Sequence, residues 1–350
     1  MATYAIWNNK GGVGKSYLTF QLACEYARVH PTARVLVIDL CPQANSSGML
    51  LGGMNAGETA LDELSGYTPP KTISGYMEDR ITSPYVNPNT GSQYLTSVRS
   101  RNGHVPGNIR LVTGDEQLEI QASRVLAATN PGPSDAWRLV HTWISDLIGD
   151  IRHAWGPSMT VFIDCNPSFG IYTELALSAA DRLIIPFSAD GSSRRAVRAV
   201  LALIYGVARR PGSGQSAFFI NSQAFRMRVP RIYRYVGNRL TQYIKSAKAF
   251  RAVVQEIGNE IWEVWESDPN LFQVHPSGTP APSRRRAFEM MFQAEIPDAN
   301  TASVVSTSLG IPIGALTAGL VSVMDKQAMV NQGQLDRQQP AMTALAESIE

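Results

Sequence analysis

The sequence is poor in cysteine and has no long apolar run. Its three cysteines, Cys24, Cys41 and Cys165, lie far apart and form no CxxC pair, which is typical of free thiols in a reducing cytoplasm and signals no metal site. The first residues lack the basic and then apolar segment that secretion requires, so we expect a cytoplasmic protein. The longest uncharged stretch, residues 299–324, is diluted by Ser, Thr and Gly and broken by Pro312. We therefore expect a pair of buried helices there and no membrane span.

Acidic residues are absent from residues 191–255, a segment that holds 13 Lys and Arg. The rest of the chain holds 18 Lys and Arg against 29 Asp and Glu, so the formal net charge of +2 conceals a strongly basic segment in an acidic protein. A segment of one charge sign indicates an anionic partner. With 17% charged and 44% hydrophobic residues, the composition argues against a disordered chain and indicates a folded globular protein.

Strand-like apolar runs alternate with helical patterns along the chain. We expect strands at residues 4–8, 34–39, 109–113, 159–164, 182–186 and 217–221, and helices at 16–30, 136–151, 172–180 and 193–208. This alternation predicts an α/β fold in which a mostly parallel β-sheet is flanked by helices on both faces. Several of the runs are almost continuously apolar, as strands buried on both faces require.

Two regions depart from this pattern. Residues 52–108 are rich in Gly, Pro, Ser, Asn and Thr, which predicts a loop-rich surface insertion. Helical stretches at 230–248 and 249–265, followed by a Pro-rich loop at 275–282, predict a mainly helical C-terminal extension over 230–330. We expect a single domain over 1–330 and a polar tail at 331–350 that is mobile or forms a short helix.

Residues 9–16 contain a glycine-rich sequence that follows an apolar strand and opens a helix. They read Asn9-Lys10-Gly11-Gly12-Val13-Gly14-Lys15-Ser16, with Tyr17 next. In this context the backbone N–H groups of the loop and of the helix start form a phosphate cradle, because both present unpaired donors to an anion. Lys15 is expected to reach the β- and γ-phosphates of ATP and Ser16 to ligate Mg²⁺. The alternative is an ordinary Gly-rich turn.

The strict phosphate-loop pattern has Gly where this chain has Asn9. The deviant form, KGGxxK followed by Ser or Thr, fits instead, and here the sequence resembles the ParA/MinD group of P-loop ATPases. The resemblance implies that Lys10 is the signature lysine, which crosses a dimer interface to the nucleotide of a second subunit. Residues 35–43 are similar to the family's switch segment, usually DxDPQ. Residues 161–168 resemble its Walker B strand, where the family holds Mg²⁺ through water at the position of Asp164.

Asp39 and Asp164 each end an apolar strand, where an aspartate can simply cap the next turn. Two of them beside a phosphate loop favour roles with metal or water. The family reads adenine with Asn or Asp at the end of a later strand, and Asn221 matches that position, although it can also be a simple turn residue. We thus expect Lys10, Lys15, Asp39 and Cys41 to act in catalysis, and Ser16, Asp39 and Asp164 at the metal.

Cys41 occupies a position where the family usually has an aspartate that orients the attacking water. A thiol with an ordinary pKa near 8.5 is mostly uncharged at neutral pH and accepts hydrogen bonds weakly. Slow hydrolysis is one interpretation. The other is that Asp39 or a main-chain group positions the water and the cysteine is tolerated. Redox sensing by Cys41 is a minor third possibility.

The basic segment predicts non-specific binding to DNA. If residues 231–245 form one helix, Ile232 and Val236 lie on its core face and the basic residues lie on the opposite face. Non-specific contacts to phosphates need only such a surface. A solvated surface, or an acidic protein or lipid partner, are the alternatives. The candidate residues are Arg194, Arg195, Arg198, Arg226, Arg228, Arg231, Arg234, Lys245, Lys248 and Arg251.

The leading functional hypothesis is a cytoplasmic, nucleoid-associated ParA-like ATPase. In this reading ATP drives formation of a homodimer, the dimer binds DNA, and a ParB-like adaptor triggers release, so that a plasmid, chromosome or other cargo is partitioned. A slow or non-hydrolysing nucleotide switch remains an alternative because of Cys41. A MinD-like membrane ATPase is less favoured, since residues 340–350 contain two Glu and no Lys or Arg. Scattered cysteines argue against an iron-protein relative.

Overall fold

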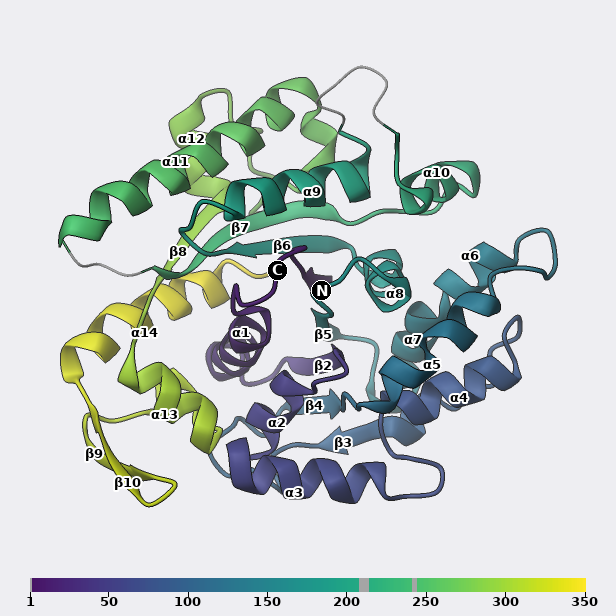
Figure 1. Cartoon of the computed structure of the whole chain (residues 1–350), viewed down its shortest axis with the longest axis horizontal. Helices are drawn as coiled ribbons and strands as arrows, with labels where there is room; N and C mark the ends of the chain where they lie inside the picture. The colour runs from purple at the N-terminus through teal and green to yellow at the C-terminus, as the bar shows by residue number, and fades with distance from the viewer. Residues whose placement is uncertain (1, 208–213, 241–243) are drawn as a thin grey trace.

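A central eight-stranded sheet organises the molecule (Figure 1). The computed structural model describes residues 2–207, 214–240 and 244–350, with side chains for all of these except residues 239–250. The strand order is β3-β4-β2-β5-β1-β6-β7-β8, and only β3 runs antiparallel to its neighbour. The strands are β1 (Thr3–Ile6), β2 (Arg34–Leu40), β3 (Leu95–Ser97), β4 (Ile109–Val112), β5 (Met159–Cys165), β6 (Arg182–Phe187), β7 (Arg231–Leu240) and β8 (Gln293–Pro297). The predicted mostly parallel α/β fold is confirmed.

Helices cover both faces of the sheet (Figure 1). One face carries α7 (Trp143–Trp155), α8 (Ile171–Ala179), α9 (Ser193–Tyr205), α11 (Ile244–Ser267) and α12 (Arg285–Phe292). The other carries α1 (Lys15–Val29), α2 (Asn45–Leu51), α3 (Gly53–Ser65) and α14 (Gln332–Glu347). The remaining helices are α4 (Ile73–Thr82), α5 (Gln117–Ala127), α6 (Ala136–His141), α10 (Ala217–Ala224) and α13 (Thr301–Leu309), and β9 (Gly319–Val323) pairs with β10 (Lys326–Val330) as a separate hairpin.

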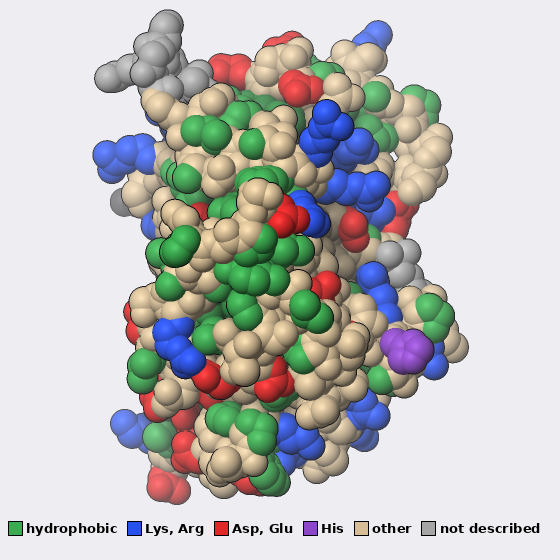
Figure 2. All heavy atoms as spheres, turned by 90° about the vertical axis from the view of Figure 1, so that its right-hand side faces the viewer, with side chains coloured by type: hydrophobic (Ala, Val, Ile, Leu, Met, Phe, Trp, Pro, Cys, Tyr) green, Lys and Arg blue, Asp and Glu red, His purple; other side chains and the backbone are tan. Residues whose placement is uncertain are grey.

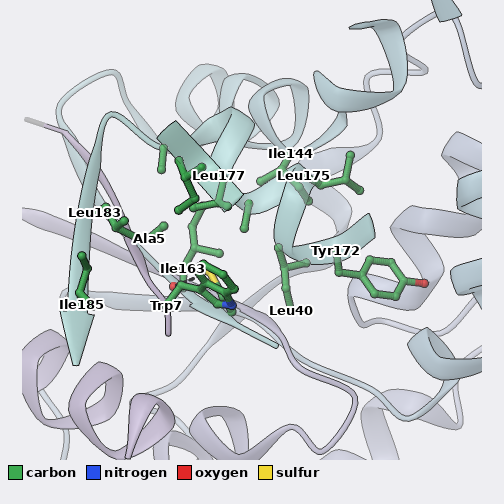
Figure 3. Packing of buried hydrophobic residues seen from close by; sticks show 14 of the residues in the cluster. Ala5, Trp7, Leu40, Ile144, Ile163, Tyr172, Leu175, Leu177, Leu183 and Ile185 are labelled. Atoms are coloured by element: carbon green, nitrogen blue, oxygen red, sulfur yellow. Dashed lines mark hydrogen bonds between the residues drawn. The ribbon is translucent and has the colours of Figure 1, made fainter. Parts of the chain in front are cut away.

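The central strands are buried on both sides because successive side chains point to opposite faces. Ile163, Leu183 and Ile185 belong to the same buried cluster as Leu175 and Leu177 of α8 on one face (Figure 3). The alternating partners, such as Tyr4, Phe162 and Ile184, pack with α1 on the other face. Two buried faces explain the almost continuous apolar runs of these strands.

The predicted strand at 217–221 and the predicted helix at 230–248 are both wrong. Residues 217–224 form α10, and the strand that follows β6 is β7, at Arg231–Leu240. In β7, Ile232 and Tyr235 bury on one face of the sheet and Tyr233 and Val236 on the other. The spacing of Ile232 and Val236 also fits a helix face, but pairing with β6 and β8 fixes the segment as a strand. The prediction of a helix at 249–265 is confirmed by α11.

Residues 52–108 are not loop-rich, contrary to the prediction. They contain α3, α4 and β3, and their Gly and Pro residues lie largely at the joints between these short elements. Gly57 shows why glycine is needed there: a Cβ at this position would lie 2.3 Å from the carbonyl oxygen of Gly48. The glycine lets α3 pack closely on α2, and a bulkier residue would hold the two helices apart.

The C-terminal part contains more β-strand than predicted. Residues 230–330 contain four strands as well as helices, and residues 299–324 contain one α-helix, α13, followed by a 3₁₀ turn and β9. Among the described residues no helix has the length and apolarity to cross a membrane. The final segment forms α14, whose Met342 and Leu345 pack in the same core cluster as α1. The division into one domain and a polar tail stays a prediction about folding units.

Candidate functional site

The glycine-rich loop lies between β1 and α1 and borders a cavity of about 510 Å³. Gly12 and Gly14 have φ angles of 75° and 77°, a left-handed conformation that side chains with a Cβ adopt only with strain. Gly14 directly precedes the first residue of α1, so the loop delivers the N-terminus of a helix to the cavity. The lining residues come from the loop, from the segment after β2, from α2 and α3, from the end of β5 and from α13: Gly11, Gly12, Gly14, Lys15, Ser16, Tyr17, Cys41, Gln43, Ala44, Asn45, Gly48, Met49, Gly53, Met54, Glu58, Cys165, Pro167 and Thr307.

Lys15 lies at the base of this cavity with only 6% of its surface exposed. Its Nζ donates hydrogen bonds to the carbonyl oxygens of Asn8, at 3.2 Å, and of Lys10, at 2.9 Å. Burial lowers the pKa of Lys15, and the nearby carboxyl of Asp164 opposes this effect. A fixed, weakly solvated ammonium group beside unpaired N–H donors is a strong binding feature for a phosphate.

Asp39 and Asp164 are neighbours in the sheet, because β2 and β5 pair in a register that sets them opposite each other. Both are fully buried, and burial raises the pKa of each carboxyl; the charge of Asp39 raises that of Asp164 further. Asp39 accepts three hydrogen bonds, from the backbone N–H of Cys41 and from the N–H and hydroxyl of Ser47, at 2.8–3.0 Å. Neither oxygen of Asp164 has a hydrogen-bond partner among the residues that the structure describes.

The difference in hydrogen bonding between Asp39 and Asp164 shows whether the site suits Mg²⁺. A buried carboxylate without partners is costly unless a cation or a donor reaches it. Ser16 and Lys15 both lie near this carboxyl, and both lower its pKa against the effect of burial. Hard oxygen ligands of this kind are those that Mg²⁺ prefers. The residues therefore fit a magnesium site built on Ser16 and Asp164, while the oxygens of Asp39 are largely engaged.

Ser47 was missed by the sequence reasoning. Its hydroxyl donates to Asp39 and accepts from the backbone N–H of Gly114, at 2.9 Å, so it ties the end of β2 to the segment after β4. The run Asn45-Ser46-Ser47 at the start of α2 was the available signal, because small polar residues at a helix start commonly bond to nearby backbone or acidic groups.

Cys41 lies in the cavity wall with 4% of its surface exposed, together with Cys165. Burial, together with the charges of Asp39 and Asp164, raises the pKa of its thiol to about 12. The thiol is therefore neutral at pH 7 and cannot act as a charged acceptor for a water proton. As the sequence suggested, a neutral thiol stands at a position where an aspartate would supply a charged carboxylate.

Lys10 points away from the cavity. Its ammonium group donates to the hydroxyls of Ser188, at 3.1 Å, and Ser193, at 3.3 Å, and it forms an ion pair with Asp190. All three partners belong to the segment between β6 and the first turn of α9. In this subunit the side chain is thus held by its own chain, and its expected reach toward a second subunit stays a prediction.

Asn221 does not end a strand, because it lies within α10. The asparagine at the end of a strand beside the phosphate loop is Asn238, in β7. Its amide donates to the carbonyl oxygens of Val13, at 3.0 Å, and Gly14, at 3.1 Å, and its own carbonyl oxygen is buried without a partner among the described residues. The assignment to Asn221 followed from taking residues 217–221 as a strand, and its contact with a base stays a prediction.

Tyr17 contributes to both the cavity and the C-terminal part. It lines the cavity, and its hydroxyl donates to Gln338 of α14 at 3.0 Å. Its ring packs in a cluster with residues of α13 and the β9–β10 hairpin. Tyr17 therefore connects the nucleotide cavity with α13, α14 and the β9–β10 hairpin, which come after the last strand of the sheet in the sequence.

The basic helix predicted over residues 231–245 is replaced by a strand at residues 231–240, and residues 241–243 are outside the described part of the chain. Arg234 lies in β7, where burial lowers its pKa. Arg194 and Arg198 of α9 pair with Glu260 of α11, and Arg194 also pairs with Glu256. The side chains of Lys245 and Lys248 are outside the described residues. The remaining candidates, Arg195, Arg226, Arg228, Arg231 and Arg251, are exposed.

These exposed arginines lie at two edges of the sheet. Arg231 begins β7, so it and Arg226 and Arg228 before it lie toward the N-terminal ends of the strands. Arg195 and Arg251 lie early in helices that follow the C-terminal ends of β6 and β7, the edge that holds the phosphate loop. Figure 2, which shows the side on which α10 lies, has Lys and Arg side chains in separate groups with acidic side chains between them. The basic segment is divided by the fold.

Comparisons with known proteins agree with this architecture. A family model described as "AAA domain" matches residues 1–213. The chromosome partitioning protein ParA of Caulobacter vibrioides is 28% identical over 187 residues, 53% of this chain and 55% of that protein. A ParA family protein of Chlamydia muridarum is 28% identical over 211 residues, 60% of this chain and 68% of that protein. The chain spans only about half the length of the first of these relatives.

Solved structures resemble the whole chain. A McdA variant from Cyanothece in complex with ATP superposes with a TM-score of 0.58 at 15% identity, covering 100% of this chain and 97% of that one. A plasmid partition protein of Borrelia burgdorferi bound to AMPPNP has a TM-score of 0.51 at 14% identity, covering 99% of each chain. At such identities the likeness establishes the fold alone.

Proposed function

We propose that this chain binds ATP with Mg²⁺, forms a dimer with a second copy around the nucleotide, and in that state binds DNA non-specifically. The chain belongs to the AAA-domain family and is a ParA-type P-loop ATPase. The observation that carries the proposal is the cavity itself, which is lined by Lys15 and the N-terminus of α1; the buried carboxyl of Asp164, which has no hydrogen-bond partner among the described residues, lies near Lys15. Relatives named for chromosome partitioning support partition of a DNA or protein cargo as the biological role.

In this proposal the phosphates of ATP lie against residues 10–16, with Lys15 at the β- and γ-phosphates. Ser16 and Asp164 would hold Mg²⁺, which neutralises charge on the phosphates when it is bound. Asn238 would hold the phosphate loop in place, since its side-chain amide donates to the carbonyl oxygens of Val13 and Gly14. Asp39 keeps the segment after β2 in place through Cys41 and Ser47.

Two lysine variants test ATP binding and dimerisation separately. Lys15→Ala removes the cavity's ammonium group and should abolish ATP binding, as measured by nucleotide titration. Lys10→Ala should leave binding largely intact and lose ATP-dependent dimerisation, as measured by light scattering, because Lys10 lines no part of the cavity. Full dimerisation of Lys10→Ala would show that the lysine does not act across an interface.

We propose that DNA binds at the edge of the sheet that carries the nucleotide, where the carboxyl ends of the parallel strands lie. Arg195 and Arg251 are exposed there, whereas Arg226 and Arg228 lie toward the opposite edge. The double variant Arg195→Glu/Arg251→Glu should weaken ATP-dependent DNA retention for all sequences equally, and each lost phosphate contact should flatten the log–log salt dependence by about 0.9. Arg226→Glu/Arg228→Glu has the same charge change and should retain DNA. The reverse pattern would move the interface to the other edge.

A second candidate is a slow or non-hydrolysing nucleotide switch that acts as a DNA-bound regulator, and the neutral thiol of Cys41 favours it. For both candidates we propose a cytoplasmic protein on the nucleoid. For the partition ATPase we also propose a ParB-like adaptor that stimulates its release from DNA. Turnover measured with and without DNA and adaptor separates the two: a switch would show no stimulation, and a partition ATPase would.

A further inference from the structure

The ammonium group of Lys10 is fully engaged within its own subunit. It can donate three hydrogen bonds, and it makes three contacts: with Ser188, Asp190 and Ser193. The residue is 180 positions from Asp190 in sequence, so only the pairing of β1 with β6 brings the two loops together. We name the group of Ser188, Asp190 and Ser193 the lysine cradle.

Asp190 in the lysine cradle is also held by its own loop. Oδ1 of Asp190 accepts from the backbone N–H of Ser192, at 3.0 Å, and from its hydroxyl, at 2.8 Å. Oδ2 accepts from the hydroxyl of Ser188 at 2.7 Å and from Lys10. Burial opposes ionisation of Asp190, but the hydrogen bonds from Lys10, Ser188 and Ser192 outweigh it and hold its pKa well below the ordinary value. The Asp190 side chain is 48% exposed, but hydrogen bonds hold both of its carboxylate oxygens.

The main chain and side chain of Lys10 serve different purposes. Its carbonyl oxygen accepts from Nζ of Lys15, which fixes the backbone of the phosphate loop. Its side chain leaves the loop on the other side and does not line the cavity. A change in the lysine's contacts can therefore occur without disturbing the groups that face the nucleotide.

We propose that Asp190, with Ser188 and Ser193, is a positioning group that retains Lys10 in its own subunit, and that Lys10 must leave this cradle before it can act on the nucleotide of a second copy. The inference rests on the proposed ATP-dependent dimer. Each of two subunits gives up an ion pair and two hydroxyl contacts when the dimer forms, so Asp190 opposes dimerisation and sets the ATP level at which it begins.

Chemical labelling tests the cradle without any dimer. Nucleotide-free protein is treated with a limiting amount of an amine-acylating reagent, and acylation of Lys10 is quantified by peptide mass spectrometry. Asp190→Asn should raise labelling of Lys10 several-fold, and Ser188→Ala should raise it less. Asp325→Asn, which removes one negative charge from the exposed turn of the β9–β10 hairpin, is the matched control and should not change it. Unchanged labelling in Asp190→Asn would overturn the proposal.

The dimer equilibrium supplies the second measurement. With ATP and Mg²⁺, the dimer dissociation constant from sedimentation should fall about 3- to 10-fold in Asp190→Asn, since exposed ion pairs are worth little each but two are released per dimer. Nucleotide affinity at concentrations where the protein is monomeric should stay the same. Weaker dimerisation of Asp190→Asn would mean that Asp190 supports the dimer and does not hold Lys10 back. If the wild type stays monomeric with ATP, the proposed dimer fails, whereas the labelling result still judges the cradle.

Discussion

Replacement of Cys41 by aspartate restores the residue that related ATPases usually have and should accelerate ATP hydrolysis. The thiol lies in the cavity wall next to Asp39 and Asp164 and is neutral, since its pKa is raised to about 12. A carboxylate there adds a strong acceptor for the attacking water, in a reaction where positioning and electrostatics supply most of the catalysis. We expect turnover to rise by about tenfold or more, which corresponds to at least ~1.4 kcal/mol off the barrier.

The same substitution should destabilise the nucleotide-free protein. A third buried carboxylate would face the two that already raise the pKa of the thiol, and like charges about 4 Å apart cost roughly 4 kcal/mol at an effective dielectric constant of about 20. We expect a lower Tm without ligand and recovery of most of the loss with ATP and Mg²⁺. Nucleotide affinity should change far less than turnover, because the effect falls mainly on the transition state.

Single-turnover hydrolysis on wild type, Cys41→Asp and Cys41→Ser decides the matter. Serine matches the size of cysteine without charge and should behave like the wild type. The competing view assigns the water to Asp39, which already accepts three hydrogen bonds but retains room for a fourth. That view predicts a neutral Cys41→Asp and an inactive Asp39→Asn. A neutral Cys41→Asp, or a wild type that hydrolyses ATP rapidly, would refute the reasoning.

Three further substitutions test other parts of the structure. Asn238→Ala removes the amide that bridges two carbonyls of the phosphate loop and should weaken ATP binding about tenfold or more in titrations, whereas Asn221→Ala should not. Gly53→Ala places a Cβ 2.2 Å from a carbonyl oxygen of α13 at a φ of +82° and should cost at least about 2 kcal/mol in denaturant unfolding; Gly103→Ala, which meets nothing within 4 Å, should cost little. Arg80→Met leaves an acidic partner on α7 without its buried guanidinium and should cost about 2–4 kcal/mol in the same assay.

Several features could be predicted because they are encoded locally. The strands β1, β2, β4, β5 and β6 were identified from apolar runs, since burial on both faces imposes that composition over a few consecutive residues. The phosphate loop was identified because its glycines, its lysine and the following helix are contiguous in sequence. Asp39 and Asp164 could be assigned to one place because the carboxyl ends of parallel strands lie at the same edge of a sheet.

Other features were beyond local patterns. The segment of β7 carries apolar residues whose spacing suits a helix face as well as a strand, and only the neighbouring strands β6 and β8 select between them. The error placed Asn221 at the end of a strand, whereas Asn221 lies in α10 and Asn238 lies near the end of β7. The turn residues in 52–108 gave no sign that they join short helices, because propensity for turns is the same at the ends of helices as in long loops.

The charge pattern shows most clearly what the sequence by itself determined and what the tertiary structure decided. Composition alone established that residues 191–255 contain no acid, but α11 begins within that segment and continues past it. Packing of α11 on α9 brings Glu256 and Glu260 back to Arg194 and Arg198 and neutralises part of the segment. In the same way the pairing of β1 with β6 joins Lys10 to Asp190. Coulomb and hydrogen-bond interactions depend on distance in space, so groups far apart in the chain acquire partners only when the sheet and helices assemble.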